Sequence, residues 1–319
     1  MMDVEGLTRL PRVVAFGGGH GLSASLTALR RITDSLTAVV TVADDGGSSG
    51  RLRDELGCLP PGDLRMALAA LCSDDHEGRT WASVLQSRFT GEGTLAGHAI
   101  GNLLIAGLWQ QLGDPVAGLD MVANLLGTRG RVLPMSSTPL SIEADVLGLH
   151  DGTPDEISTL CGQATIASTP GTVQAVRITP RDAPACPEAV DAILEADSVV
   201  LGPGSWFTSV IPHLLVPDLA RAITATKAQR VLVLNMAPAD ETDGFSPSRH
   251  IELLAEHAPT LRLDVVIADT GFANSDRHLE RYAASLGARL EIADIGVRDG
   301  SARHDTNRLA SVFSEVLAL

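Results

Sequence analysis

The sequence predicts an α/β protein built on a Rossmann-like, doubly wound and mainly parallel sheet, with a helical layer and an inserted antiparallel subdomain. Three observations carry this prediction. Short apolar strands alternate with helical segments near both ends of the chain, as a parallel sheet covered on both faces requires. A glycine-rich loop joins the first strand to the first helix. A long helical stretch and a β-rich stretch then separate the two α/β regions.

The first α/β unit is predicted from two apolar strands near the start of the chain. RVVAF (12–16) stops at a run of glycines, after which SASLTALRR has a helical pattern. A second strand, LTAVVTVA (36–43), ends in the polar, flexible run DDGGSSGR. Residues 63–126 then show several helical patterns and no convincing strand, among them DLRMALAALC, WASVLQSRF and LAGHAIGNLLIAGLWQQL.

The middle of the chain has a different pattern of apolar and polar residues. Between 128 and 180, short alternating stretches are separated by turn signals, which predicts an inserted and largely antiparallel subdomain containing RVLPMS, SIEADVLGL and VQAVRITP. The α/β alternation then returns, with strands expected at 197–202, 230–236, 263–269 and 288–294. The expected organisation is a Rossmann-like domain formed by residues 1–127 and 181–319, interrupted by the insert at 128–180.

Composition restricts the classes of partner. Apolar residues make up 45% and charged residues 20% of the 319-residue chain, as in globular proteins that fold by themselves. The net charge of −15 argues against nucleic acid, because nucleic-acid binders neutralise phosphates with a basic surface. The four cysteines form no CxxC pair or zinc pattern, and no run approaches the roughly 20 apolar residues of a membrane span. We expect a cytoplasmic protein without membrane insertion, and a homodimer stays open.

The glycine run after the first strand is the leading candidate site. Glycines let the backbone approach a phosphate closely, and a helix N-terminus supplies unpaired N–H groups and a positive dipole end. One glycine would serve a tight turn, whereas four in five positions indicate a ligand. The run also contains a GxGxxA match at 19–24, although it begins two residues earlier than that motif and has no Walker A ending. The expected phosphate-binding residues are Gly17, Gly18, Gly19, His20, Gly21 and Leu22.

The polar loop after the second strand is the next candidate. Its two adjacent carboxylates would repel each other unless a cation or backbone N–H groups relieved them. This leaves room for a Mg²⁺ ion held through a phosphate, although no metal site is firmly indicated. The serines and the arginine could donate to phosphate or sugar oxygens, and a plain surface loop is the alternative. The residues are Asp44, Asp45, Gly46, Gly47, Ser48, Ser49 and Arg51.

Further candidates lie at helix starts and strand ends. Asp63 could cap the helix that begins there, with Arg65 in its first turn, and a plain helix start explains both equally well. His98 and Asn102 fall four apart on one face of a predicted helix, where a satisfied core histidine is the alternative. Arg303 could reach an anion or stay solvated. Strand-end loops supply the rest, because open α/β sheets bind ligands there: Gly202, Pro203, Gly204, Ser205, Asn235 and Asp243.

Five segments in order, GGGHGLS, VADDGGSSGRLRDELGCLPPGDLR, GHAIGNLLIAGL, GPGSWFTSVIP and ETDGF, closely resemble the YvcK family, also called gluconeogenesis factors. That family belongs to the larger group containing the 2-phospho-L-lactate transferase CofD. The resemblance runs from about residue 12 to the C-terminus, and its second block is highly specific. It implies a Rossmann-like fold, a cytoplasmic location and a role in carbon metabolism, peptidoglycan supply and cell shape.

The resemblance also implies a ligand, a UDP-sugar and in particular UDP-N-acetylglucosamine. Residues 17–21 would hold the diphosphate, and the DDGGSSGR and GPGS loops would complete the pocket. His20 stands where many relatives are expected to carry a small hydroxylated residue, and segment 235–245 also departs from the family pattern before the shared ETDG. Both lie near the expected pocket, so the ligand preference stays open.

Three functions fit these features. The leading expectation is a nucleotide-sugar-binding regulator without an evident reaction, because no Ser/His/Asp set, HExxH motif or cysteine nucleophile can be picked out. The first alternative is a CofD-like transferase acting on a phosphate-linked donor, with Asp44 or Asp45 positioning Mg²⁺ and His98 in support. The second is an NAD-dependent oxidoreductase, suggested by GxGxxA and the acidic pair that follows the second strand, and weakened by the lack of a clear proton relay.

Overall fold

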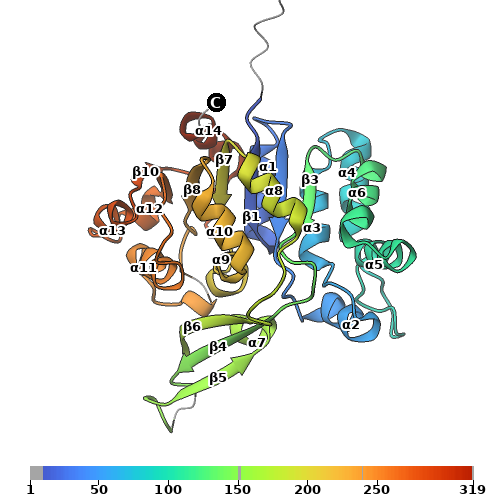
Figure 1. The fold of residues 1–319 in the computed structure, drawn as a ribbon, viewed down its shortest axis with the longest axis horizontal. Coiled ribbons are helices and arrows are strands. Elements are labelled where there is room, and N and C mark those ends of the chain that lie inside the picture. Colours follow the sequence, from blue (N-terminus) through green and yellow to red (C-terminus); the bar gives the residue numbers. More distant parts are fainter. Residues whose placement is uncertain (1–9, 150–151, 239, 318–319) are drawn as a thin grey trace, which may run out of the picture.

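A computed structural model describes residues 10–149, 152–238 and 240–317. Its main feature is a seven-stranded sheet in the order β10-β9-β8-β7-β1-β2-β3 (Figure 1), and every neighbouring pair is parallel. The order reverses between β1 and β7, and at such a switch point open α/β sheets bind ligands. The strands are β1 (Val13–Gly17), β2 (Leu36–Val40), β3 (Arg131–Pro134), β7 (Ser198–Leu201), β8 (Gln229–Val233), β9 (Val265–Asp269) and β10 (Arg289–Ala293).

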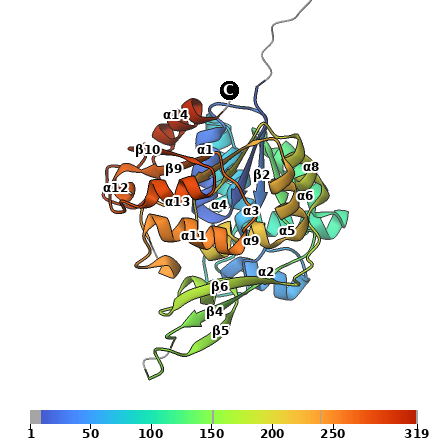
Figure 2. The ribbon, with the colours of Figure 1, turned by 60° about the vertical axis from the view of Figure 1, so that its left-hand side comes forward.

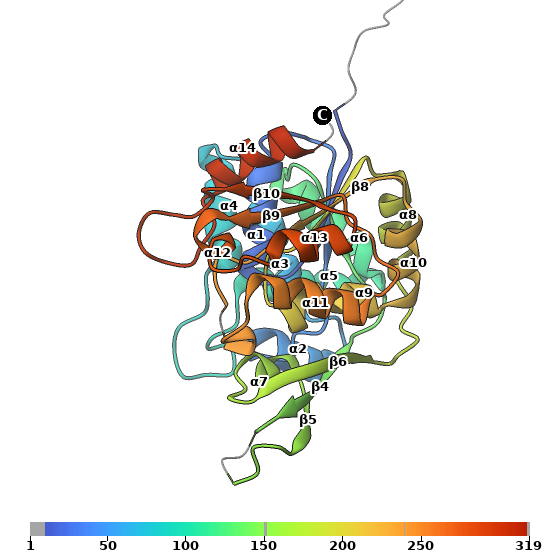
Figure 3. The same cartoon turned by 90° about the vertical axis from the view of Figure 1, so that its left-hand side faces the viewer.

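Helices cover both faces of this sheet, so its central strands are buried and mostly apolar. All residues of β1 and β7 are buried. On one face α1 (Gly19–Leu29) packs between α3 (Gly62–Leu71) and α14 (Thr306–Val316), and on the other α8 (Pro187–Glu195) lies against α10 (Pro217–Ala225), as Figure 3 shows. The predicted doubly wound α/β fold is confirmed, and the strands expected at 197–202, 230–236, 263–269 and 288–294 are all present.

The helical layer expected at 63–126 is also present. After α3 it contains α4 (His76–Gln86), α5 (Ile100–Leu112) and α6 (Pro115–Leu126). The polar run after β2, expected to be flexible, was predicted wrongly in its second half. There α2 (Gly47–Leu56) forms, because Asp44 Oδ1 accepts from the backbone N–H of Gly46 at its start and Gly57 closes its end in the left-handed conformation.

The insert is a small antiparallel sheet in the order β5-β4-β6, which projects away from the main sheet in Figures 1 and 2. Across β4 and β6, Arg177 pairs with Glu143 at 3.1 Å and with Asp145 at 2.6 Å. The segment RVLP, expected in the insert, instead forms β3 and pairs in parallel with β2, since its buried apolar residues need cover on both faces. The insert comprises β4 (Ser141–Leu147), β5 (Ile157–Cys161), α7 (Gln163–Ala167) and β6 (Thr172–Thr179).

The C-terminal half adds short helices around β7 to β10. In the described part of the chain, no helix is both long and apolar enough to cross a membrane. The remaining elements are the π-helical turn η1 (Trp206–Val210), α9 (Pro212–Leu215), the 3-10 turn η2 (Asp240–Thr242), α11 (Pro247–His257), α12 (Thr270–Ala273) and α13 (Leu279–Ser285).

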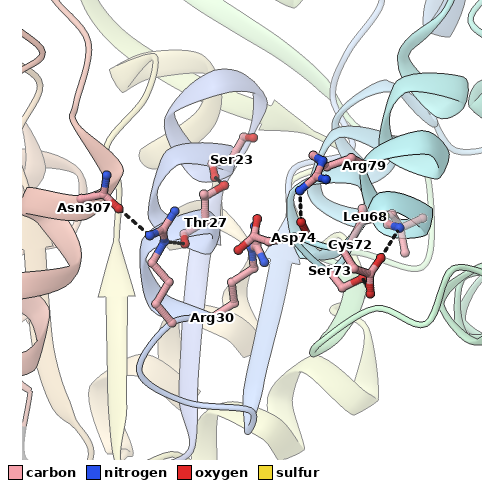
Figure 4. A network of polar contacts seen from close by, with 12 residues as sticks. Ser23, Thr27, Arg30, Leu68, Cys72, Ser73, Asp74, Arg79 and Asn307 are labelled. Carbon is pink, nitrogen blue, oxygen red and sulfur yellow. Dashed lines mark hydrogen bonds and ion pairs between the residues drawn. The ribbon is translucent and has the colours of Figure 1, made fainter.

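Polar contacts at the C-terminal end of α1 tie the two halves of the chain together (Figure 4). The guanidinium of Arg30 contacts the carboxylate of Asp74 at 2.5 Å, between α3 and α4. The neighbouring Arg31 donates to Asn307 in the first turn of α14. This holds α1 in place, and with it the loop that precedes the helix.

Candidate functional site

A cavity of about 630 Å³ opens at the carboxyl ends of β1 and β7, where the strand order reverses. Ligand pockets in proteins commonly measure about 300–1,000 Å³, so the cavity can hold a nucleotide-sized molecule. Its walls come from the loops after β1, β7 and β8, from the insert, and from the segment before α14. The predicted site residues that line it are Gly18, Gly19, His20, Gly21, Asp63, Pro203, Gly204, Ser205, Asn235 and Arg303.

The glycine loop has no room for side chains at two of its positions. A Cβ atom on Gly18 would lie 2.3 Å from Asp63 Oδ2 and 2.6 Å from Thr41 Cγ2. A Cβ atom on Gly21 would lie 2.3 Å from the carbonyl oxygen of Pro203. The loop after β1 therefore packs directly against the loop after β7, and only glycine permits that approach.

The N-terminus of α1 opens into the cavity. Gly18 is its N-cap residue and offers no side chain to accept from the first-turn N–H groups, and this turn contains no acidic residue. Unpaired amides and the positive end of the helix dipole attract an anion. Gly19, His20 and Gly21 line the cavity beside this helix end.

The carboxyl group of Asp63 lies against the glycine loop. It does not cap α3, whose N-cap residue is Pro61, but contacts the loop and accepts a backbone hydrogen bond from Gly19. Its Oδ2 atom is enclosed and has no partner among the described residues. Burial above all, and then the charge of Asp44, raise the pKa of Asp63 to about 7. The carboxyl group can therefore donate or accept a proton near neutral pH.

Asn235 fixes the loop after β7. Its Oδ1 accepts from the backbone N–H of Gly204 at 2.9 Å, and its Nδ2 donates to the Gly204 carbonyl at 3.0 Å. This pair of bonds uses both ends of the side-chain amide. Asn235, expected as a ligand contact, lines the cavity and also holds Gly204 against the glycine loop.

Two further side chains in the lining carry buried polar atoms without a partner among the described residues. They are the Oε1 atom of Gln163 on α7 and the indole N–H of Trp206 at the start of η1. With the Asp63 carboxyl, they leave acceptors and a donor unpaired around one cavity. Unpaired buried polar groups are costly, so a polar ligand would relieve them.

The acidic pair after β2 does not line the cavity. Asp44 accepts from Gly46 and points toward the start of α3, where its Oδ2 would lie 2.9 Å from a Cβ on Gly62. Asp45 turns to the insert, where its Oδ1 accepts from the backbone N–H of Ala164 at 2.9 Å. Across the described ranges no three His, Cys, Asp or Glu side chains gather to hold a metal ion, so a Mg²⁺ ion there would depend on phosphate oxygens.

Ser48, His98 and Asn102 meet away from the cavity. The Ser48 hydroxyl oxygen lies 3.0 Å from His98 Nδ1 and accepts from Asn102 Nδ2 at 3.0 Å. The expectation that His98 lies on the helix with Asn102 was wrong, because α5 begins at Ile100 and the backbone of Phe89 donates to the His98 carbonyl. Burial, and then the charge of Arg51, lower the pKa of His98. This cluster joins α2 to α5.

The other predicted residues lie outside the lining. Ser49 accepts from the backbone N–H of Gly62, Arg51 donates to the Ala96 carbonyl at 2.8 Å, and buried Arg65 donates to Gln86. Asp243 lines a neighbouring cavity. The remaining predicted residues lie at or beside the loops after β1, β2 and β7 and are not part of the lining: Gly17, Leu22, Gly46, Gly47 and Gly202.

Several lining residues were missed from the sequence. Ser209, shortly after the GPGS loop, was expected from the sequence to be a possible donor together with Ser205, and it lines the cavity. Thr242 carried only a weak signal, because it belongs to ETDG. Gln163 and Val297 carried none, because long-range folding brings them to the site. The lining residues that were missed are Ser23, Ala24, Thr27, Gln163, Trp206, Met236, Ala237, Glu241, Thr242, Val297, Ala302, His304 and Thr306.

Comparison with known proteins identifies the family. The family model described as 2-phospho-L-lactate transferase CofD matches residues 13–308. A Mycobacterium tuberculosis protein named "Putative gluconeogenesis factor" is 56% identical, with 96% of this chain and 90% of that protein covered. The gluconeogenesis factor of Listeria monocytogenes is 35% identical, with 96% of each covered. A crystal structure of a UPF0052 family member from Bacillus halodurans matches with a TM-score of 0.84 and 33% identity, covering 96% of this chain and 99% of that one. The chain therefore belongs to the CofD family and, within it, to the gluconeogenesis factors of the YvcK family.

Proposed function

We propose that the chain binds a nucleotide sugar of the UDP-N-acetylglucosamine type in the cavity at the glycine loop. The observation that carries this proposal is the N-terminus of α1. Its N-cap residue has no side chain to accept from the first turn, and the helix end opens into a cavity lined by Gly19, His20 and Gly21, beside the Asp63 carboxyl group that accepts from Gly19. A diphosphate is the part of such a ligand that this corner suits, because helix N-termini bind phosphate through backbone N–H groups. Binding would regulate carbon metabolism, peptidoglycan supply and cell shape.

The rest of the cavity suits the remainder of such a ligand. Ser205, Ser209 and Thr306 are part of its lining, as is Arg303. Hydroxyl and guanidinium groups can donate to phosphate and sugar oxygens. The cavity has both polar and apolar lining residues, and it extends from the glycine loop to Gln163 of the insert.

Calorimetry on the full chain tests the proposal with UDP-N-acetylglucosamine, UDP and NAD as separate ligands. Heat with both UDP compounds and none with NAD is the expected result. Binding heat with NAD alone would favour a dinucleotide site in place of the proposed one. The absence of binding heat with all three ligands would refute the proposed ligand site at the glycine loop.

One observation favours a second function, group transfer on a phosphate-linked donor in the manner that the name of the CofD family indicates. The Asp63 carboxyl lines the cavity with a pKa of about 7 and an unpartnered oxygen, and Asp44 is close enough to raise that pKa. Oxygen ligands of this kind suit Mg²⁺, which commonly takes one or two carboxylates together with substrate phosphates. Asp44 and Asp63 would hold the ion, and the ion would neutralise charge on the phosphates.

Turnover of a nucleoside diphosphate-linked substrate with Mg²⁺ would establish this second function. Asp63→Asn is expected to abolish it while Asp54→Asn, an exposed site on α2, leaves it intact. Equal rates in wild type and Asp63→Asn would exclude Asp63 from any such reaction.

A further inference from the structure

The insert contributes a side chain to the cavity of the main domain. Gln163 is the first residue of α7, and it lines the same cavity as the glycine loop. Its Oε1 atom is buried and accepts no hydrogen bond from any described residue. A buried acceptor without a donor is costly, so a donor from a bound molecule would be favourable here.

The position of Gln163 is set by Asp45. Its carboxylate accepts from the backbone N–H of Ala164 at 2.9 Å, one residue after Gln163. On the other side of Gln163, a Cβ atom on Gly162 would lie 2.2 Å from Asp45 Oδ2, and Gly162 has a φ of +96°. Asp45 thus reaches from the loop after β2 across to the insert and holds the turn that presents Gln163.

The diphosphate of a nucleotide sugar cannot satisfy Gln163, since phosphate oxygens only accept hydrogen bonds at neutral pH. The donors of such a ligand are the hydroxyl and acetamido N–H groups of the N-acetylglucosamine, the two hydroxyls of the ribose and the imide N–H of the uracil. The phosphate-binding features lie on the main domain, at the start of α1. Gln163 comes from the insert, and α7 packs against η1, whose first residue Trp206 also lines the cavity.

We propose that Gln163 accepts a hydrogen bond from the ligand beyond its diphosphate, and that Asp45 is the positioning residue that holds Gln163 toward the cavity. The inference rests on the proposed nucleotide-sugar site. It gives the insert a defined role, which is to select the ligand by its sugar or nucleoside while the main domain holds the phosphates.

Calorimetry on Gln163→Met tests the contact, with UDP-N-acetylglucosamine, UDP-glucose and UDP as ligands. Methionine keeps the length of the side chain and removes the acceptor. We expect affinity for UDP-N-acetylglucosamine to fall about tenfold. If UDP keeps its affinity, the donor belongs to the sugar, and UDP-glucose then separates acetamido from hydroxyl. If UDP weakens equally, the donor belongs to the nucleoside, that is, to the ribose or the base. The matched control, Gln174→Met on β6, lies outside the lining and should bind like wild type.

The role of Asp45 is tested by a double-mutant comparison. Asp45→Ala should weaken UDP-N-acetylglucosamine several-fold, and adding it to Gln163→Met should cause little further loss, because both changes remove the same contact. Amide hydrogen exchange of residues 164–167 without ligand should also be faster in Asp45→Ala. Additive losses, or unchanged exchange, would overturn the positioning role.

Two failures are distinguishable. If wild type and Gln163→Met bind UDP-N-acetylglucosamine equally well, this inference is overturned and the proposed nucleotide-sugar site still holds. Wild-type protein that binds no UDP compound would overturn the proposed function, and this inference with it.

Discussion

At the scale of single residues, the raised pKa of Asp63 predicts how the stability of the protein depends on pH. Its pKa is raised from 3.8 to about 7, so between these values the folded protein keeps a proton that the unfolded chain has released. Stability should therefore fall as pH rises through this window. Asp63→Asn cannot ionise, and we expect it to be more stable than wild type at about pH 8 by roughly 1–3 kcal/mol, with the difference shrinking toward about pH 4.

Urea unfolding across this pH range measures the effect, and Asp54→Asn on the exposed face of α2 is the control. A parallel pH dependence in wild type and Asp63→Asn would mean that Asp63 ionises normally. In that case the carboxyl group would repel a bound diphosphate at neutral pH unless a cation accompanied the ligand.

Two arginines in the segment before α14 offer a matched pair. Both side chains are exposed, at 71% for Arg303 and 79% for Arg298. Arg303 lines the cavity and pairs with Asp299 at 2.6 Å, whereas Arg298 pairs with Asp294 outside the lining. Arg303→Ala should weaken UDP binding about five- to tenfold, because a charge-assisted contact to phosphate is lost. Arg298→Ala should not. Equal affinities of wild type and Arg303→Ala in calorimetry would place Arg303 outside the phosphate contacts.

At the scale of elements, the hydroxyl of Ser48 connects α2 to the start of α5. Ser48→Ala would leave His98 Nδ1 and the amide of Asn102 without this partner, in buried surroundings. We expect a loss of about 1–3 kcal/mol in the free energy of unfolding and no change in ligand affinity. Ser168→Ala, an exposed serine on the insert, should cost little. Weakened UDP binding with full stability would instead make Ser48 a ligand contact.

Elements also show what the sequence could predict. Strands such as β7 and β9 are buried along their whole length and carry apolar runs, VVL and VVIA, because both faces are covered, and these runs are visible without a structure. β3 has the same buried character over only four residues beside turn signals, so it was assigned to the insert. The start of α5 was misplaced because Gly97, with a φ of +78°, and the bridge between Arg88 and Ala99 keep His98 out of the helix.

The site was predictable in part for a related reason. The glycine loop and the GPGS loop follow strands of one parallel sheet, whose carboxyl ends must meet at one edge, so their meeting could be expected. The direction in which each side chain points could not be predicted from the sequence. Asp44 and Asp45 are adjacent in sequence but turn to α3 and to α7, and Gln163 reaches the cavity only through the packing of the insert.

At the scale of the whole molecule, the cavity draws its walls from both halves of the chain and from the insert. The halves share one sheet through the pairing of β1 with β7, and α1 contacts α14 on its face. A ligand in the cavity should therefore stabilise the molecule as one unit. At a concentration of about 100 times its Kd, UDP-N-acetylglucosamine should add about 2.7 kcal/mol, which raises Tm by roughly 4–8 °C in a single transition.

Differential scanning calorimetry with and without the ligand measures this shift, and Arg303→Ala at the same ligand concentration should show a smaller one. Two transitions, of which only one moves, would show that the halves unfold separately and that the ligand contacts just one of them. The shared sheet argues against that outcome. Separating β1 from β7 would expose strands that are buried on all sides, and the cost of exposing that apolar surface couples each half to whatever the other half binds.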